Sequence, residues 1–357
     1  MNNNRYCIIM AGGFGTRFWP ISRRSKPKQF LDILGTGKSF IRSTFERFLP
    51  LVPKENFLVV TNGIYKEQVL EHIPELQESQ ILCEPIGRNT APCIAYATYM
   101  LKKINPEASM IVTPADHLIL NQNDFLEIIQ ECLDFSIQNN ALMTVGIKPT
   151  RPDTGYGYIQ KSNNDVISRV KCFTEKPNLE LAQTFVECGE FFWNSGIFIW
   201  TVENIIKAFE RHLPEHHALF SAIVDDFATE REAKSIEQVF SECKPISIDY
   251  GVMEKADNVY VRCGDIGWSD VGTWGSLYHL SRKDRYANVK LSDGCYAYNT
   301  RNTIISLPEG KVAIINGLKD YVVVDTPDVL MVCPRSEEQS IKKYIDEVKF
   351  EKGDKHV

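Results

Sequence analysis

The 357-residue sequence lacks the features that would assign it to several large classes of protein. It has no apolar run near the roughly 20 residues that a membrane-spanning helix needs, and the segment Met1–Arg5 lacks the character of a secretory signal. Its ten cysteines form no C-x-x-C pair, so the sequence favours neither a zinc site nor a disulfide framework. A net charge of −6 argues against partners held by bulk positive charge. We therefore expect a reduced, cytoplasmic protein that binds neither nucleic acid nor membrane.

Short apolar runs alternate with longer amphipathic segments through the first part of the chain. The predicted strands cover residues 6–10, 57–60, 80–82, 110–112 and 142–145, and the predicted helices cover 64–72, 91–104 and 125–139. This alternation predicts an α/β fold whose Rossmann-like sheet is mixed but mostly parallel. Ligands of such sheets bind at the carboxyl ends of the strands.

The pattern changes twice further along the chain. Residues 155–159 and 170–174 read as strands of an inserted or antiparallel region, and helical patterns return at 179–187 and 202–212. Beyond residue 283 the chain holds short β-rich runs separated by Gly, Asn and Asp, then a terminal helix over 336–349 that Ser336 would cap. We expect a large domain over residues 1–283 and a small, β-helix-like domain over residues 284–357 that ends in this helix.

A glycine-rich segment follows the first predicted strand. Gly12, Gly13 and Gly15 stand between Ala11 and Thr16, and glycines allow backbone N–H groups to approach a polyanion closely. Residues 11–30 contain no acidic side chain but carry five cationic ones: Arg17, Arg23, Arg24, Lys26 and Lys28. The segment therefore fits a nucleoside triphosphate. It is neither a dinucleotide fingerprint, because Phe18 replaces the third glycine, nor a P-loop, because no Gly-Lys-Ser/Thr follows.

The pattern G-G-x-G-x-R with a following P-K-Q resembles the signature of the sugar-nucleotide pyrophosphorylases. Its form here, Phe18–Arg23 with Lys28–Phe30, is most similar to the mannose-1-phosphate guanylyltransferases. The resemblance implies a nucleotidyltransferase (GT-A-like) domain. It also implies that the loop Ala11–Thr16 and Arg17 hold the triphosphate, and that Lys28 contacts it near the reacting end.

A second segment, Glu84–Pro92, reads from its residues alone as a turn that enters a helix capped by Asn89 or Thr90. It also resembles the family segment E-P-x-x-R-N-T-A-P, which lies near the base and ribose. The resemblance assigns Glu84, Arg88 and Asn89 to nucleotide binding. A carboxylate there could accept hydrogen bonds from N1–H and N2–H₂ of guanine.

Two further groups of residues complete the expected site. Asp116 follows a predicted buried strand, where an oxygen ligand for a hard cation is plausible, although a helix-capping role is the alternative. The resemblance makes Asp116 and Asp270 ligands of Mg²⁺. It also places Gly155, Glu175, Lys176 and Asn194 in the sugar-phosphate pocket, together with the candidates Asp249 and Tyr250. Without the resemblance, Glu175 and Lys176 read as a surface charge pair.

The resemblance implies transfer of GMP from GTP to α-D-mannose 1-phosphate, which yields GDP-mannose and pyrophosphate. The expected catalytic residues are Arg17, Lys28, Asp116 and Lys176. Two alternatives stay open: a nucleotidyltransferase for another sugar 1-phosphate and nucleotide, and a non-catalytic nucleotide-sugar sensor. The resemblance also allows a homodimer, because the β-rich C-terminal domain often makes subunit contacts in this family.

Overall fold

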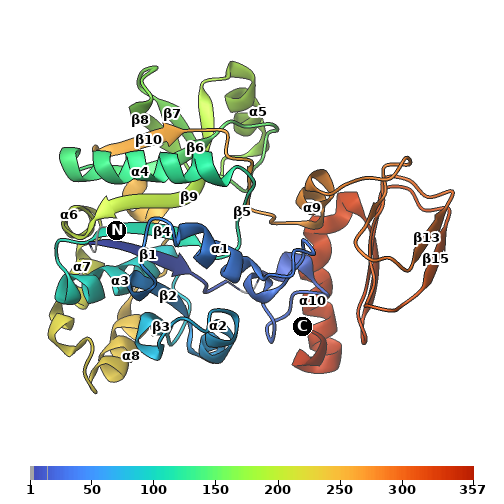
Figure 1. The fold of residues 1–357 in the computed structure, drawn as a ribbon, viewed down its shortest axis with the longest axis horizontal. Coiled ribbons are helices and arrows are strands. Elements are labelled where there is room, and N and C mark those ends of the chain that lie inside the picture. Colours follow the sequence, from blue (N-terminus) through green and yellow to red (C-terminus); the bar gives the residue numbers. More distant parts are fainter. Residues whose placement is uncertain (1–3, 14) are drawn as a thin grey trace. The chain divides into compact units, whose positions relative to one another are not determined.

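The computed structural model describes residues 4–13 and 15–357 and divides the chain into two compact units (Figure 1). The first unit comprises Met1–Gly12, Ile41–Ala115 and Ile119–Trp268. The second comprises Gly13–Phe40, Asp116–Leu118 and Ser269–Val357. The chain thus leaves the first unit directly after Gly12, within the glycine-rich segment.

A nine-stranded sheet with the order β3-β2-β1-β4-β9-β6-β10-β8-β7 forms the first unit. Its strands are β1 (Arg5–Met10), β2 (Phe57–Asn62), β3 (Ile81–Glu84), β4 (Ser109–Pro114), β6 (Leu142–Ile147), β7 (Tyr158–Lys161), β8 (Ile167–Thr174), β9 (Phe191–Thr201) and β10 (Val259–Cys263). The pairings give β8 and β9 one direction and all the other strands the opposite one. The predicted mixed, mostly parallel sheet is confirmed.

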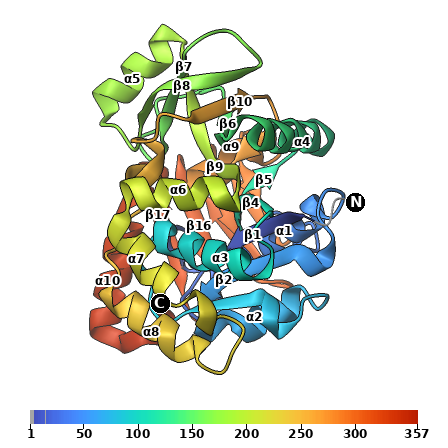
Figure 2. The same ribbon diagram turned by 90° about the vertical axis from the view of Figure 1, so that its left-hand side faces the viewer.

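Helices cover both faces of this sheet (Figure 2). Alternate strand residues such as Leu58 and Val60 pack with the helices of one face: α3 (Thr90–Ile104), α6 (Val202–His212), α7 (Pro214–Ala222) and α8 (Glu232–Glu242). Phe57 has the opposite parity, and its ring lies 4.6 Å from that of Phe45 in α1 (Phe40–Phe48). The period of two along the strands therefore distributes the apolar side chains between two helical layers. The remaining helices of this unit are α2 (Lys66–His72), α4 (Gln122–Asn139) and α5 (Leu179–Cys188).

The second unit contains a β-helix-like stack. Its elements are α9 (Trp274–Leu280), β12 (Val289–Lys290), β13 (Cys295–Tyr298), β14 (Ile304–Ser306), β15 (Ala313–Asn316), β16 (Tyr321–Asp325), β17 (Leu330–Pro334) and α10 (Ile341–Lys352). Parallel pairing places Val289, Ile304 and Val322 at one register, and all three are buried in a core shared with Trp274 and Ile341. The predicted small β-helix-like domain is confirmed in kind, and the boundary near residue 283 stays a prediction.

Two sequence-based element predictions need correction. The terminal α-helix begins at Ile341 rather than at 336, because Arg335–Ser340 form a 3₁₀ helix in which Glu338 accepts a hydrogen bond from the Gly275 N–H, at 2.6 Å. The strand predicted over 155–159 begins only at Tyr158. Two further short strands, β5 (Leu118–Ile119) and β11 (Trp268–Ser269), pair with each other.

Candidate functional site

A cavity of about 280 Å³ lies within the second unit. The residues that line it are Gly15, Arg17, Lys28, Asp116, His117, Asp270 and Gly272. Five of these come from the sequence-based site prediction, although they extend from position 15 to position 270 of the chain. The fold thus brings three of the expected triphosphate residues, Gly15, Arg17 and Lys28, and both expected metal ligands to one cavity.

Lys28 is the most buried side chain of this cavity, with only 3% of its surface exposed. Its Nζ donates to Asp116 Oδ2 at 2.9 Å, to the Asp116 carbonyl at 3.1 Å and to the Asp270 carbonyl at 2.6 Å. These bonds match the three donors of an ammonium group. In this state Lys28 joins the two segments that carry the expected metal ligands, and its donors are directed at the protein.

Gly15 is required by its backbone conformation and by its closeness to Lys28. Its φ of +57° lies in the left-handed region, and a Cβ at this position would lie 2.5 Å from Lys28 Cβ. The carbonyl of Gly15 accepts a hydrogen bond from Ser22 Oγ at 2.6 Å. The glycine therefore permits the close packing of the loop on Lys28.

The two carboxylates of this cavity offer oxygen donors suited to a hard cation. Burial by itself raises the pKa of Asp116, but the charges of Lys28 and His117 and the hydrogen bond from Lys28 outweigh it, so the pKa lies below its ordinary value. Asp270 Oδ1 accepts from the Gly272 N–H at 3.0 Å. Across residues 4–13 and 15–357, no group of three or more Asp, Glu, His or Cys side chains is placed to hold a metal. Two carboxylates fit Mg²⁺ nevertheless, because this ion usually binds one or two carboxylates together with water and substrate phosphates.

A second cluster of predicted residues lies within the first unit, at the ends of β8 and β9. Lys176 Nζ lies 2.5 Å from Glu175 Oε1, and the Glu175 side chain is almost fully buried. Lys176 has a φ of +47°, and its backbone N–H donates to the Tyr156 carbonyl at 3.2 Å. The pKa of Lys176 is raised, because the hydrogen bond and the charge of Glu175 exceed the opposing effect of burial. The pair therefore has a defined geometry that a pair of freely solvated surface charges lacks.

Asn194, the next predicted residue of this cluster, is hydrogen-bonded to a partly buried acidic residue. Its Nδ2 donates to Asp249 Oδ1 at 2.9 Å, and its Oδ1 accepts from Thr144 Oγ1 at 2.9 Å, so the orientation of the amide is fixed. Asp249 begins a π-helical turn over Asp249–Met253. Burial and the charge of Glu175 raise the pKa of Asp249 to about 7, although Lys176 opposes them.

Two further residues contribute to this cluster: Gly157, from the same turn as Gly155, and Glu254, to which sequence reasoning gave no role. A Cβ at Gly157 would lie 2.4 Å from Glu175 Oε2, so only glycine fits there without moving the carboxylate. Glu254 accepts the Glu175 N–H at 2.9 Å. The Tyr250 hydroxyl donates to the Glu175 carbonyl at 3.3 Å, whereas Gly155 lies in an exposed turn and its N–H donates to Asp153 Oδ1 at 2.9 Å. Sugar-phosphate binding by these two residues stays a prediction.

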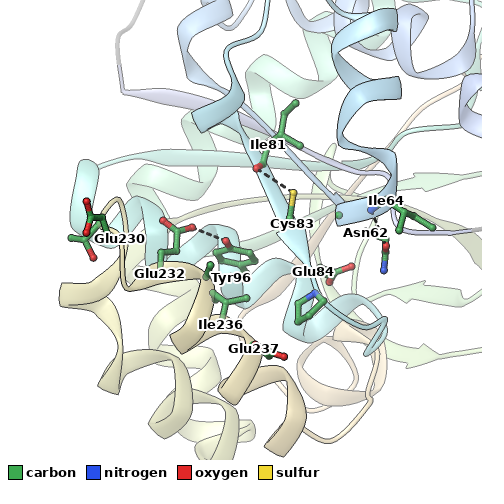
Figure 3. Close-up of a pocket in the computed structure, with 14 residues that line it drawn as sticks. Asn62, Ile64, Ile81, Cys83, Glu84, Tyr96, Glu230, Glu232, Ile236 and Glu237 are labelled. Carbon is green, nitrogen blue, oxygen red and sulfur yellow. Dashed lines mark hydrogen bonds between the residues drawn. The ribbon is translucent and has the colours of Figure 1, made fainter.

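Glu84 lies at the end of edge strand β3 and lines a larger cavity of about 690 Å³ (Figure 3). It is 4% exposed, and its Oε1 has no hydrogen-bond partner. Its Oε2 lies 3.1 Å from the position that a Cβ on Gly12 would take, so glycine permits this close approach. Burial raises the pKa of Glu84 to about 8. A buried carboxyl with one unsatisfied oxygen is suited to a ligand with N–H donors.

The two other residues predicted to bind the nucleotide make contacts within the protein. Arg88 donates from Nε to the Phe240 carbonyl at 2.9 Å and from Nη2 to the Ser241 carbonyl at 3.2 Å, near the C-terminus of α8. Asn89 has a φ of +70° and caps α3 through its side chain, which accepts from the Thr90 N–H. The predicted cap is confirmed, and nucleotide binding by both residues stays a prediction.

Comparisons with known proteins identify the family of this chain. Residues 6–286 match the nucleotidyl transferase family, and residues 297–348 match the family described as the MannoseP isomerase/GMP-like beta-helix domain. A mannose-1-phosphate guanylyltransferase from Escherichia coli is 38% identical over 349 residues, which cover 95% of this chain and 74% of the relative. One from Salmonella montevideo is 37% identical over 361 residues, with 98% and 75% covered.

Solved structures show the same likeness. A crystal structure from Thermus thermophilus, described as a mannose-1-phosphate geranyltransferase, has a TM-score of 0.86 at 31% identity and covers 97% of this chain and 99% of its own. A mannose-6-phosphate isomerase from Helicobacter pylori has a TM-score of 0.63 at 27% identity, with 74% and 99% covered. Among the residues that the structure describes, no helix is both long and apolar enough to cross a bilayer. The chain belongs to the nucleotidyl transferase family, in the group of the mannose-1-phosphate guanylyltransferases.

Proposed function

We propose that this protein transfers GMP from GTP to α-D-mannose 1-phosphate and releases pyrophosphate. The observation that carries the proposal is the match over nearly the whole chain to mannose-1-phosphate guanylyltransferases, joined to the cavity that holds Arg17, Lys28, Asp116 and Asp270. In this reaction a phosphate oxygen of the sugar attacks the α-phosphorus of GTP, the bond to the β-phosphate oxygen breaks, and pyrophosphate leaves. The attacking phosphate is already ionised at neutral pH, so no general base is needed.

The main obstacle to this reaction is electrostatic. Two unit charges at 4 Å repel by about 4 kcal/mol at an effective dielectric near 20. One such repulsion, left uncompensated, slows the reaction by about a thousandfold. The protein must therefore place positive charge around the reacting phosphates.

In the second unit, Arg17 supplies this charge directly, because it is exposed and lines the cavity. The glycine-rich loop, including backbone N–H groups at Gly13, Gly15 and Thr16, would donate hydrogen bonds to phosphate oxygens. Lys28 would act first as the tie that orients Asp116 and the Asp270 segment, and only after release from these partners as a phosphate ligand. Enzymes of this kind generally use a divalent metal; we propose Mg²⁺, held by Asp116 and Asp270, which when bound supplies Lewis-acid charge to the phosphate oxygens.

In the first unit, the cluster around Glu175 would bind the sugar phosphate. Lys176 keeps half of its side-chain surface exposed and can turn its ammonium from Glu175 toward the phosphate. The buried carboxylate of Glu175 and the oriented amide of Asn194 can bind sugar hydroxyls. Tyr250 would stabilise this pocket, because its hydroxyl donates a hydrogen bond to the Glu175 carbonyl.

The base would be read by Glu84. Its unsatisfied Oε1 can accept from N1–H and N2–H₂ of guanine, and uracil, thymine, cytosine and adenine do not offer this pair of donors. We place Ala11, Gly12, Arg88 and Asn89 in the same nucleotide site. In this role Arg88 and Asn89 would act partly through the turn that they stabilise.

Pyrophosphate release across a panel of nucleoside triphosphates and sugar 1-phosphates tests the proposal. We expect GTP with mannose 1-phosphate to be turned over fastest. A faster reaction with glucose 1-phosphate and another nucleotide would assign a different substrate pair. Tight binding of GDP-mannose without turnover of any pair would instead make the protein a sensor.

A further inference from the structure

Arg23 lies within the loop from Gly15 to Lys28, and its guanidinium is occupied within the protein. Nη1 and Nη2 donate to the two carboxylate oxygens of Asp328, at 2.7 and 2.6 Å, in a bidentate pair. Nη2 also donates to Thr326 Oγ1 at 3.2 Å, and Nε donates to the Pro20 carbonyl at 3.0 Å. Arg23 therefore does not act as one of the free phosphate-binding cations that the sequence suggests, but ties the loop to the turn between β16 and β17.

A second tie joins the same loop to residues near the end of the chain. The indole N–H of Trp19 donates to the His356 carbonyl at 2.7 Å, and Trp19 is buried. His356 Nδ1 lies 3.0 Å from Asp328 Oδ2, so the two ties share one carboxylate. Val357 packs on the apolar cluster that contains Phe18 and Trp19.

Both ties connect through short backbone links to the cavity residues. Arg23 and Lys26 exchange two backbone hydrogen bonds, at 3.1 and 3.0 Å, immediately before Pro27 and Lys28. Trp19 lies two residues after Arg17. The Ser22 hydroxyl, in the same segment, donates a hydrogen bond to the Gly15 carbonyl. Backbone and hydrogen bonds therefore connect Arg23 and Trp19 to residues at both ends of the loop.

We propose that Arg23, Trp19, Asp328 and the segment Gly353–Val357 are positioning residues, which hold the loop from Gly15 to Lys28 in the shape that binds the triphosphate. The proposal rests on the function proposed above. The β-helix-like stack and the residues that follow it thereby serve the reaction, although none of these positioning residues lines the cavity. Because a bidentate, charge-assisted pair is stronger than a simple surface ion pair, its loss should be measurable.

Two conservative variants test the proposal in the full-length protein. Asp328→Asn removes the charge of the shared carboxylate, and Trp19→Phe removes the bond to His356 but keeps an aromatic ring. We expect each variant to raise KM for GTP by roughly tenfold, with a smaller change in KM for mannose 1-phosphate. Hydrogen exchange should quicken in the loop from Gly15 to Lys28. Both sets of hydrogen bonds act on one loop. The KM for GTP of the double variant should therefore rise by less than the product of the two single fold-increases.

Asp325→Asn is the matched control, because Asp325 forms an ion pair with Lys311 in the same strand region and has no bond to the loop. We expect it to lower Tm without changing KM for GTP or loop exchange. Unchanged KM and exchange in Asp328→Asn and Trp19→Phe would overturn the proposal, as would an equal rise of KM in Asp325→Asn. A wild-type protein that binds no GTP would instead refute the proposed function, and the exchange measurement would still test the ties.

Discussion

At the residue scale, the charge of Asp116 can be removed with little change of shape. Asp116→Asn keeps an amide oxygen that can accept from Lys28, so we expect the fold to survive. Turnover should fall by roughly a hundredfold or more, the usual cost of losing one electrostatic stabiliser. Steady-state pyrophosphate release with circular dichroism checks both statements. Asp293→Asn, at an exposed position of the same unit, is the control, and near-normal turnover of Asp116→Asn would remove Asp116 from the machinery.

Glu84 gives a pH-dependent prediction. Its pKa in the folded protein is raised to about 8, whereas the pKa of glutamate in an unfolded chain is about 4.3. Between these values the folded protein retains a proton that the unfolded chain has lost, so this group's contribution to stability is full below about 4.3 and is lost as pH rises to 8. Glu84→Gln removes the titration. We therefore expect the Tm of wild type to fall further than the Tm of Glu84→Gln between pH 5 and pH 8.

Thermal melts across this pH range measure the difference, because other titrating groups are shared and cancel. Glu237→Gln, at an exposed position on the same cavity, should follow wild type. Parallel curves for wild type and Glu84→Gln would contradict the assignment of a raised pKa to this carboxyl.

At the scale of elements, the turn before β7 fixes the carboxylate at the end of β8. Gly157→Ala would place a Cβ 2.4 Å from Glu175 Oε2, and the side chain must move. We expect kcat/KM for mannose 1-phosphate to fall by roughly ten- to a hundredfold, as is usual for a misplaced substrate-binding group, with little change in GTP affinity. Kinetics with each substrate varied in turn measure this. An equal loss for both substrates would contradict a sugar-specific role.

The same scale shows what the sequence could predict. Apolar runs placed β2, β4 and β6, because their burial is encoded by local periodicity. The start of α10 was missed, because Glu338 is held by Gly275, a residue 63 positions away. The occupation of Lys28 by Asp116 and Asp270 was missed for the same reason: motif order predicts which residues share a site, but long-range contacts decide what each donor binds.

At the scale of the whole molecule, the structure makes a prediction that differs from the sequence-based boundary near residue 283. The core of the second unit joins Phe18, Trp19 and Trp274 to Ile304 and Val322 of the β-helix-like stack. Ile304 is fully buried, so Ile304→Ala should cost about 2–5 kcal/mol of stability. If the unit opens cooperatively, residues 15–40 should lose hydrogen-exchange protection together with residues 284–352, whereas the nine-stranded sheet should keep its protection.

Ile199→Ala provides the reciprocal test, because Ile199 is equally buried but lies in β9 of the first unit. It should quicken exchange in the sheet and leave residues 15–40 and the β-helix-like stack protected. If Ile304→Ala quickened exchange only in residues beyond 283, the loop from Gly15 to Lys28 would unfold with the nine-stranded sheet rather than with the β-helix-like stack. The shared burial of Trp19 and Ile304 in one apolar cluster argues for the opposite result, since the removal of packing from one side of a core weakens every element that the core supports.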